Sequence, residues 1–235
     1  MSRVDVVVPV YNEERDLPTR VPQLWGFLRE HLLCPWTIVI ADNGSTDGSL
    51  EIAQNISKRY AGVTYVHITQ KGRGRALKQV WLESQADVMS YMDVDLSTEL
   101  EALPRLVAAI ETEGYDVAIG SRLAPGAKVV RSPKREFTSR MYNVLIRVIF
   151  PGVKFHDAQC GFKAISRRAA QDLLPLVRNT NWFFDSELLL LAHRKGYRIK
   201  EIPVAWNEDP DTRVKVVRTA WEDIKGLLRM RFRRL

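Results

Sequence analysis

The first half of the chain alternates between short apolar segments and longer segments with helical periodicity. The apolar segments, rich in β-branched residues, span 4–10, 36–41, 63–68, 86–92 and 115–120, and the helical segments span about 14–32, 47–60, 73–84 and 99–113. Continuous apolar runs of this length are typical of strands buried on both faces of a parallel sheet. The alternation therefore predicts an α/β fold with a mostly parallel sheet and right-handed crossovers.

Polar residues precede several of the helical segments and predict where helices begin. Ser, Thr, Asp and Asn are favoured at the N-cap because their side chains accept a hydrogen bond from the first helical turn. The expected caps are Asp47, Ser97 or Thr98, and Asp185, which precedes the apolar segment SELLLLA.

Two amphipathic helices are expected after the sheet. In the segment 135–150, polar residues recur every four positions and apolar residues cover the opposite face. The polar positions are Arg135, Ser139, Asn143 and Arg147, and the apolar ones are Phe137, Met141, Val144, Leu145, Val148 and Ile149. Such a helix either lies in a membrane interface or packs on the core with a wet polar face.

The C-terminal segment, 207–235, predicts a basic amphipathic helix. Its apolar stripe is Val217, Trp221, Ile224 and Leu228, and its cations are Arg218, Lys225, Arg229, Arg231, Arg233 and Arg234. Cations at an anionic leaflet contribute about 1 kcal/mol each, so the segment suits a membrane surface. A capping helix with a solvated basic end explains the same pattern.

Composition narrows the class of protein and its compartment. The 235 residues are 46% hydrophobic and carry a net charge of +7, which fits one large domain and an anionic partner. Two distant cysteines, Cys34 and Cys160, argue against a disulfide framework and for a reducing compartment. Acidic residues come too early for a signal peptide, and no apolar run is long enough to span a membrane. We therefore expect a cytoplasmic protein that contacts membranes only peripherally.

The loops after the predicted strands collect acidic, amide and glycine residues. They are PVYNEE, ADNGSTDG and MDVDLS, and QKGRGR opens the third helix. Ligands of open α/β sheets bind beyond the carboxyl ends of the strands, so these loops are expected to converge.

Asp93 and Asp95 lie two residues apart after an apolar strand, where their carboxylates point the same way and repel each other. A divalent cation with hard oxygen ligands, Mg²⁺ or Mn²⁺, would relieve this repulsion and bridge to a diphosphate. A solvated loop in which Asp95 caps the next helix is the alternative.

KGRGRALKQ, residues 71–79, combines flexible glycines, cations and a helix N-terminus, which together favour phosphate binding. It lacks the GxxxxGK[ST] spacing of nucleoside triphosphatases. We expect Lys71 or Arg75 to neutralise a departing diphosphate, although solvated cations would look the same in the sequence.

A nucleotide base or ribose would find acceptors and a stacking surface in the first two loops. Asp42 and Glu13 could accept hydrogen bonds, and Pro9 and Tyr11 could pack on the base. A turn and a helix start remain open as the alternative for both loops.

Seven motifs in order, PVYNEE, DNGSTDG, KGRGRAL, DVDLS, GSR, DAQCGFKA and WFFDSELL, resemble family 2 glycosyltransferases. Within that family the chain is most similar to polyprenyl-phosphate (dolichyl-phosphate) glucosyl- and mannosyltransferases. The resemblance covers about residues 3–206. It implies a Rossmann-like GT-A domain, 1–206, with a nucleotide-sugar-binding half, 1–120, and an acceptor-binding half, 121–206.

The resemblance also assigns roles to residues. It implies that Asp93 and Asp95 hold Mg²⁺ or Mn²⁺ against the diphosphate of UDP-glucose or GDP-mannose. The nucleotide contacts would be Pro9, Tyr11, Glu13 and Asp42. Arg122, with Arg131 or Arg135, would hold the acceptor phosphate near Ser139, and Asp157 and Gln159 would bind sugar hydroxyls. Cys160 is expected to be buried and inert.

The chemistry separates two kinds of acceptor. A lipid monophosphate is already anionic near neutral pH, because its second pKa is about 6, whereas a hydroxyl nucleophile needs a general base. The expected reaction is therefore inverting transfer to a polyprenyl phosphate at a membrane surface, with Asp95 and Arg122 essential. The alternative is a hydroxyl acceptor with Asp185 or Glu187 as base.

Partners follow from the same reasoning. A protein without membrane-spanning helices would need a further contact to stay at the membrane, and a small integral membrane partner could provide it. A nucleic-acid-binding protein, suggested by the basic charge alone, ranks last because no aromatic RNA-stacking motif is present.

Overall fold

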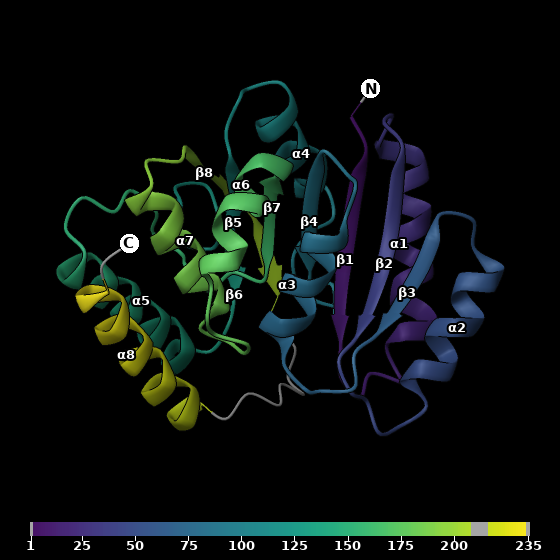
Figure 1. Ribbon diagram of the computed structural model, residues 1–235, viewed down its shortest axis with the longest axis horizontal. Helices are drawn as coiled ribbons and strands as arrows, with labels where there is room; N and C mark the ends of the chain where they lie inside the picture. Colours follow the sequence, from purple (N-terminus) through teal and green to yellow (C-terminus); the bar gives the residue numbers. More distant parts are fainter. Residues whose placement is uncertain (1, 208–215, 234–235) are drawn as a thin grey trace.

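The computed structural model of the chain describes residues 2–207 and 216–233. A seven-stranded sheet with the order β3-β2-β1-β4-β7-β5-β8 forms its centre (Figure 1). The strands are β1 (Val4–Val10), β2 (Trp36–Asp42), β3 (Val63–His67), β4 (Val88–Met92), β5 (Val117–Ser121), β7 (Phe162–Ser166) and β8 (Ile199–Pro203). All neighbours are parallel except β7, which runs antiparallel to β4 and β5. The predicted mostly parallel α/β sheet is confirmed.

Helices cover both faces of this sheet, because each strand offers apolar side chains to both sides. On one face lie α1 (Leu17–His31), α2 (Ser49–Arg59) and α4 (Ala102–Glu111), and on the other lie α3 (Arg73–Glu83), α6 (Arg167–Leu173) and α7 (Phe184–Arg194). A short 3₁₀ helix, η1 (Leu174–Leu176), follows α6. In β1, Val7 packs with the α3 side, whereas Val6 and Val8 pack with the α1 side.

The structure corrects two of the predicted helix starts. Helix α2 begins at Ser49, and Asp47 lies before it with its carboxylate accepting from the Ser49 amide at 3.0 Å. Helix α4 begins at Ala102 rather than after Thr98. The segment 97–99 instead pairs with β9 (Ala205–Asn207), which forms a small parallel sheet with β6 (Lys128–Val130). Long-range backbone pairing thus replaces the local cap.

Helix α5 (Pro133–Ile149) turns the middle of its polar stripe inward, contrary to the expectation of a wet polar face, while Arg147 stays exposed. Ser139 and Asn143 are buried, and the side-chain oxygen Oδ1 of Asn143 accepts from the Ala158 amide at 2.9 Å. The apolar residues Phe137 and Val148 are instead 67% and 70% exposed. The face of α5 that holds the loop before β7 is therefore the buried one.

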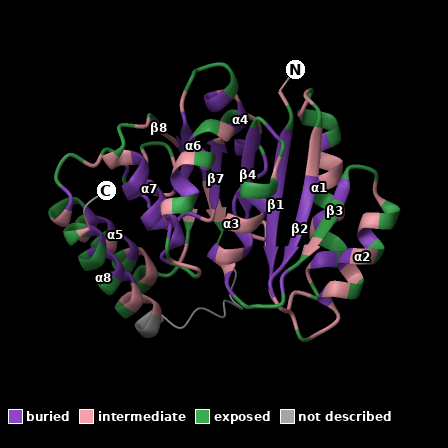
Figure 2. Ribbon diagram, in the orientation of Figure 1, coloured by how far each residue is buried: buried purple, intermediate pink, exposed green. Residues whose placement is uncertain are grey.

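Helix α8 (Val216–Phe232) packs against α5 and α7 (Figure 1). Its inner face buries Asp223, Leu227 and Met230, and its outer face exposes Trp221, Ile224 and Leu228 of the predicted apolar stripe. Figure 2 shows exposed positions on the outward sides of both α5 and α8. The side chains of Val217 and Arg218, and the residue Arg234, lie outside the described part of the chain.

Crossing a bilayer requires a helix that is both long and continuously apolar. No helix among the described residues meets both requirements.

Two glycines provide a matched test of how α8 is packed. A Cβ at Gly226 would lie 2.5 Å from two ring atoms of Phe183, whereas a Cβ at Gly26 in α1 meets nothing within 4 Å. Gly226→Ala should lower the free energy of unfolding by about 1–3 kcal/mol through overpacking. Gly26→Ala should raise it by up to about 1 kcal/mol through helix propensity. Urea denaturation measures both; a stabilised Gly226→Ala variant would contradict the described packing.

Candidate active site at the carboxyl edge of the sheet

The sheet register brings the predicted loops to one edge. The β1–β2 pairing ends with Val10 beside Asp42, and the β2–β3 pairing ends with Asp42 beside His67. Strand β4 ends at Met92, immediately before Asp93. The residues that follow β1, β2 and β4 therefore share this edge, as the sequence predicts for parallel strands.

The antiparallel strand β7 brings a further loop to the same edge. Phe162, its first residue, pairs with Met92, so the preceding residue Gly161 meets Asp93. A Cβ at Gly161 would lie 1.8 Å from a carboxylate oxygen of Asp93. Only glycine permits this approach, so the loop that ends at Gly161 lies against Asp93.

Arg73 links Asp93, the first of the two acidic residues after β4, to Asp185 at the start of α7. Its Nε and Nη2 donate to Asp93 Oδ1 at 3.2 and 2.8 Å, and its Nη1 donates to Asp185 Oδ2 at 2.7 Å. Gly74 permits this arrangement, because a Cβ there would lie 2.6 Å from the Cβ of Phe184. The sequence marks Lys71 and Arg75 as the phosphate-neutralising cations and misses Arg73, whose flanking glycines are the available signal.

Asp185 is buried and fully engaged. Lys163 Nζ lies 3.0 Å from its Oδ1, and the Tyr91 hydroxyl donates to the same oxygen. Burial alone would raise the pKa of Asp185, but the charges of Lys163 and Arg73, with the Tyr91 hydrogen bond, hold that pKa below its usual value. The N-cap interpretation is wrong, because α7 begins at Phe184 and the carboxylate pairs with these cations instead.

Arg122 and Asp157 form a second buried pair. Arg122 donates to Asp157 from Nε at 2.8 Å, from Nη2 at 2.9 Å and from its backbone amide at 2.9 Å. Burial would raise the pKa of Asp157, but Arg122 outweighs it and lowers that pKa. The structure thus places the predicted phosphate-binding arginine against the predicted sugar-binding carboxylate. Both oxygens of Asp157 orient Arg122.

The predicted nucleotide contacts lie at the ends of β1 and β2. Asp42 is buried and contacts His67 Nδ1 at 2.6 Å through Oδ2, a partner that the sequence does not indicate. Lys71 Nζ lies 3.4 Å from the centre of the Tyr11 ring, so these two predicted residues do meet.

The other residues of these loops are fixed mainly through the backbone. The Glu13 amide donates to the Ser49 hydroxyl at 2.8 Å, and the Arg75 amide donates to the carbonyl of Thr180 at 3.0 Å. Pro9 is buried in β1 beyond the last residue that pairs with β4, where its missing N–H costs no ladder hydrogen bond.

The predicted acceptor-binding residues of α5 differ in environment. Arg131 is buried and donates to Glu136, whereas Arg135 is half-buried. The Ser139 hydroxyl is buried and has no hydrogen-bond partner among the described residues.

The loop before β7 carries two further predicted residues. Gln159 Nε2 donates to Asp223 Oδ2 of α8 at 2.9 Å. Cys160 is fully buried, and burial raises the pKa of its thiol to about 12, which keeps it uncharged as expected for an inert cysteine.

The acidic pair suits a hard cation that also binds the substrate. Asp93 is 43% exposed on its side chain, and Asp95 Oδ1 accepts from the Ser97 amide at 2.9 Å. Within the described residues, no three His, Cys, Asp or Glu side chains come together as a metal cluster. Mg²⁺ is commonly held by one or two carboxylates together with substrate phosphates, and Asp93 and Asp95 fit that pattern.

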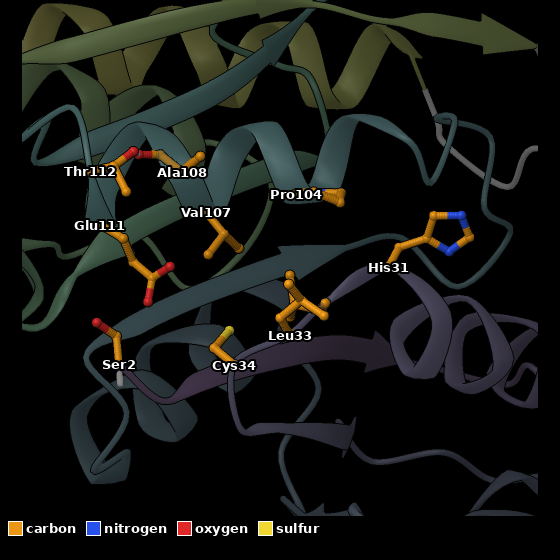
Figure 3. Close-up of a pocket in the computed structure, with 10 residues that line it drawn as sticks. Ser2, His31, Leu33, Cys34, Pro104, Val107, Ala108, Glu111 and Thr112 are labelled. Atoms are coloured by element: carbon orange, nitrogen blue, oxygen red, sulfur yellow. The ribbon is translucent and has the colours of Figure 1, made fainter.

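A surface hollow of about 330 Å³ lies away from these residues (Figure 3). Its lining includes Ser2 and Cys34, which precede β1 and β2, and Glu111 at the end of α4. This hollow therefore belongs to the amino-terminal edge of the sheet, and no predicted site residue lines it.

The chain is similar in sequence to known glycosyltransferases. The chain is 36% identical over 226 residues to the glycosyltransferase AglD of Haloferax volcanii, covering 95% of this chain and 35% of that protein. It is 32% identical to the dolichyl-phosphate beta-glucosyltransferase of Saccharomyces cerevisiae, covering 87% of this chain and 67% of the yeast protein. The chain thus spans about a third of the first relative and two thirds of the second.

Solved structures show the same fold. Glucosyl-3-phosphoglycerate synthase from Mycobacterium tuberculosis, in complex with uridine diphosphate, superposes with a TM-score of 0.75 at 19% identity over 98% of this chain and 80% of that chain. This likeness confirms the expected GT-A architecture. A family model described as glycosyl transferase family 2 matches residues 5–174. The chain therefore belongs to glycosyl transferase family 2.

Proposed function

We propose that this chain transfers a hexose from a nucleotide-sugar to a polyprenyl (dolichyl) phosphate, with inversion at the anomeric carbon and with Mg²⁺ or Mn²⁺ as cofactor. The relatives named dolichyl-phosphate beta-glucosyltransferases favour UDP-glucose over GDP-mannose as the donor. Solved relatives with Mn²⁺ and uridine-diphosphate-glucose support the same donor and metal.

The donor would lie along the edge formed by β1, β2 and β4. Tyr11 is the proposed contact for the base, and Lys71, over the Tyr11 ring, adds a cation beside it. Asp42 is buried against His67 and would contribute by holding the end of β2. Asp93 and Asp95 would hold the metal ion, which when bound would neutralise charge on the leaving diphosphate. Arg73 keeps the Asp93 carboxylate in a fixed orientation.

One observation carries the choice of acceptor: Asp185 already receives Arg73, Lys163 and Tyr91. A general base must be able to accept a proton near neutral pH, and a carboxylate with a lowered pKa does so poorly. A phosphate oxygen is ionised near neutral pH and needs no base. The engaged carboxylate therefore favours a phosphate acceptor over a hydroxyl.

Glu187 is the other candidate base, and neighbouring groups also occupy its carboxylate. Arg229 Nη2 lies 3.0 Å from its carboxylate, and the amides of Arg178 and Asn179 donate to it. Glu187 therefore anchors α8 and the preceding loop.

Arg122 is the proposed acceptor-phosphate contact. Asp157 fixes its guanidinium through Nε and Nη2, which leaves Nη1 to point elsewhere with its two N–H groups. Arg135 and Ser139, in the first half of α5, are the further proposed contacts, and Arg131 beside them pairs with Glu136. The lipid phosphate oxygen would attack the anomeric carbon in line with the departing nucleoside diphosphate.

The outward faces of α5 and α8 form the proposed membrane-contacting surface. Its apolar residues are Phe137, Met141, Val144 and Val148 from α5, and Trp221, Ile224, Leu228 and Phe232 from α8. Cations beside them include Lys134, Arg140, Lys225 and Arg231, all exposed. An apolar face bordered by cations suits an anionic lipid surface. Arg229 and Arg233 pair with Glu187, so they contribute less to this surface than the sequence suggests.

Asp95→Ala should abolish transfer and its metal dependence while leaving the fold intact, because Asp95 is half-exposed in the loop after β4 and outside the buried core. Purified protein would be offered UDP-glucose or GDP-mannose with polyprenyl phosphate across a Mn²⁺ titration, with labelled lipid as the readout and circular dichroism for folding. Glu101→Ala, an exposed change just before α4, is the control. An active, metal-responsive Asp95→Ala variant would contradict the assignment of Asp95 as a metal ligand.

Arg122→Lys should weaken use of the lipid acceptor far more than hydrolysis of the nucleotide-sugar, because lysine keeps the charge but loses the planar fork. A tenfold or larger rise in the acceptor KM is expected, which corresponds to about 1.4 kcal/mol. Steady-state assays with and without lipid separate the two activities. Equal losses in both would argue against the phosphate contact.

Trp221→Ala combined with Phe232→Ala should reduce binding to vesicles that contain anionic phospholipid, because each change removes exposed aromatic surface from α8. Leu33→Ala is the matched control, since Leu33 is exposed but lines the hollow at the opposite edge of the sheet. Co-sedimentation measures the bound fraction. An equal loss for the control, or no loss for the double variant, would place the membrane contact elsewhere.

A further inference from the structure

Helix α8 carries a buried acid that the proposed reaction does not use. Asp223 is 2% exposed and lies on the inner face of α8, with Gly226 and Leu227. Its Oδ2 accepts from Gln159 Nε2 at 2.9 Å, and its Oδ1 is buried without a hydrogen-bond partner among the described residues. Among the described residues, no cation forms an ion pair with Asp223, whereas Asp157 and Asp185 each pair with an arginine.

The surroundings of Asp223 make its ionised form costly. Burial, together with the negative charges of Asp185 on α7 and Glu222 on α8, raises the pKa of Asp223 to about 7, and the Gln159 hydrogen bond opposes this shift. On the α5 side, the Tyr142 hydroxyl donates a hydrogen bond to the Ser186 hydroxyl at 2.7 Å. Tyr142 stays neutral because burial raises its pKa. An aspartate in an unfolded chain has a pKa near 3.9, so this carboxyl lowers the stability of the fold as the pH rises toward 7.

The residue that Asp223 contacts belongs to the proposed sugar site. Gln159 lies in the loop that ends with Gly161, which meets Asp93. A side-chain amide has two distinguishable ends, a donor NH₂ and an acceptor oxygen. An ionised carboxylate accepts hydrogen bonds but cannot donate them, so it binds the NH₂ end. The amide oxygen of Gln159 is then left for a donor, such as a sugar hydroxyl.

We propose that Asp223 is a positioning residue that holds the Gln159 amide with its oxygen available to the hexose, so that α8 supplies part of the sugar site. This inference rests on the proposed function and on the assignment of Gln159 to the sugar site that the family resemblance implies. It also gives the outward-facing helix α8 a direct connection to the reaction centre. When Asp223 is protonated its hydroxyl can donate to the amide oxygen of Gln159, which turns the amide and withdraws that oxygen.

The first test follows the hydrogen bond itself in the full chain. With ¹⁵N-glutamine labelling, the Gln159 side-chain amide is assigned by its loss in Gln159→Met. Its resonances should shift with a midpoint near pH 7 in the wild-type protein and should not shift in that range in Asp223→Asn. A wild-type Gln159 amide whose resonances match those of Asp223→Asn at every pH from about 5 to about 9 overturns the inference. This readout needs neither donor nor acceptor, so it is independent of whether lipid-linked sugar is formed.

The second test separates positioning from a merely structural role. Asp223→Leu should weaken UDP-glucose binding in the presence of Mn²⁺ about tenfold at pH 8, because the amide is no longer held, whereas Asp223→Asn should change it less than about threefold. Asp223→Asn should also unfold at a higher temperature than the wild type at pH 8, since it removes a costly buried charge. Leu227→Ala is the control; it should lower the unfolding temperature without changing donor affinity. Equal donor affinities for wild type and Asp223→Leu overturn the inference.

Discussion

A buried ion network around Asp185 connects four elements of the fold, and the geometry of the candidate site depends on it. Arg73 of α3 and Lys163 of β7 contact its carboxylate, and Tyr91 of β4 donates to it. Burying these charges is costly, and removing one partner from such a network typically costs about 3–5 kcal/mol because the others are left unpaired. Since Arg73 also contacts Asp93, the network fixes the acidic pair at the same time.

One reversed strand gives the site its second side. In a fully parallel sheet, the segment before a strand lies at the far edge, away from the ligands. Strand β7 is antiparallel, so the loop before it reaches the carboxyl edge, where Gly161 meets Asp93 and Asp157 meets Arg122. The donor and acceptor sides of the proposed reaction are thereby brought together by backbone pairing, before any side chain contributes.

Helices α5 and α8 face two environments. Their inner faces hold the loop before β7, through Asn143 of α5 and Asp223 of α8. Their outer faces carry exposed apolar residues with cations beside them, which the proposed function assigns to a lipid surface. In the proposed function, the same two helices would contact the membrane on their outer faces and support the loop before β7 on their inner faces.

The sequence by itself determined the mostly parallel sheet and the loops that meet at its edge, because buried strands need continuous apolar segments and these are local. It also marked Asp93 and Asp95, which stand out after an apolar strand. Only the tertiary structure decided the partners of Asp185, Asp157 and Gln159, since each pair joins residues far apart in the chain. It likewise decided which part of α5 is buried: local periodicity shows that a helix has two faces, but the packing of α5 buries Ser139 and Asn143 and leaves Phe137 and Val148 exposed.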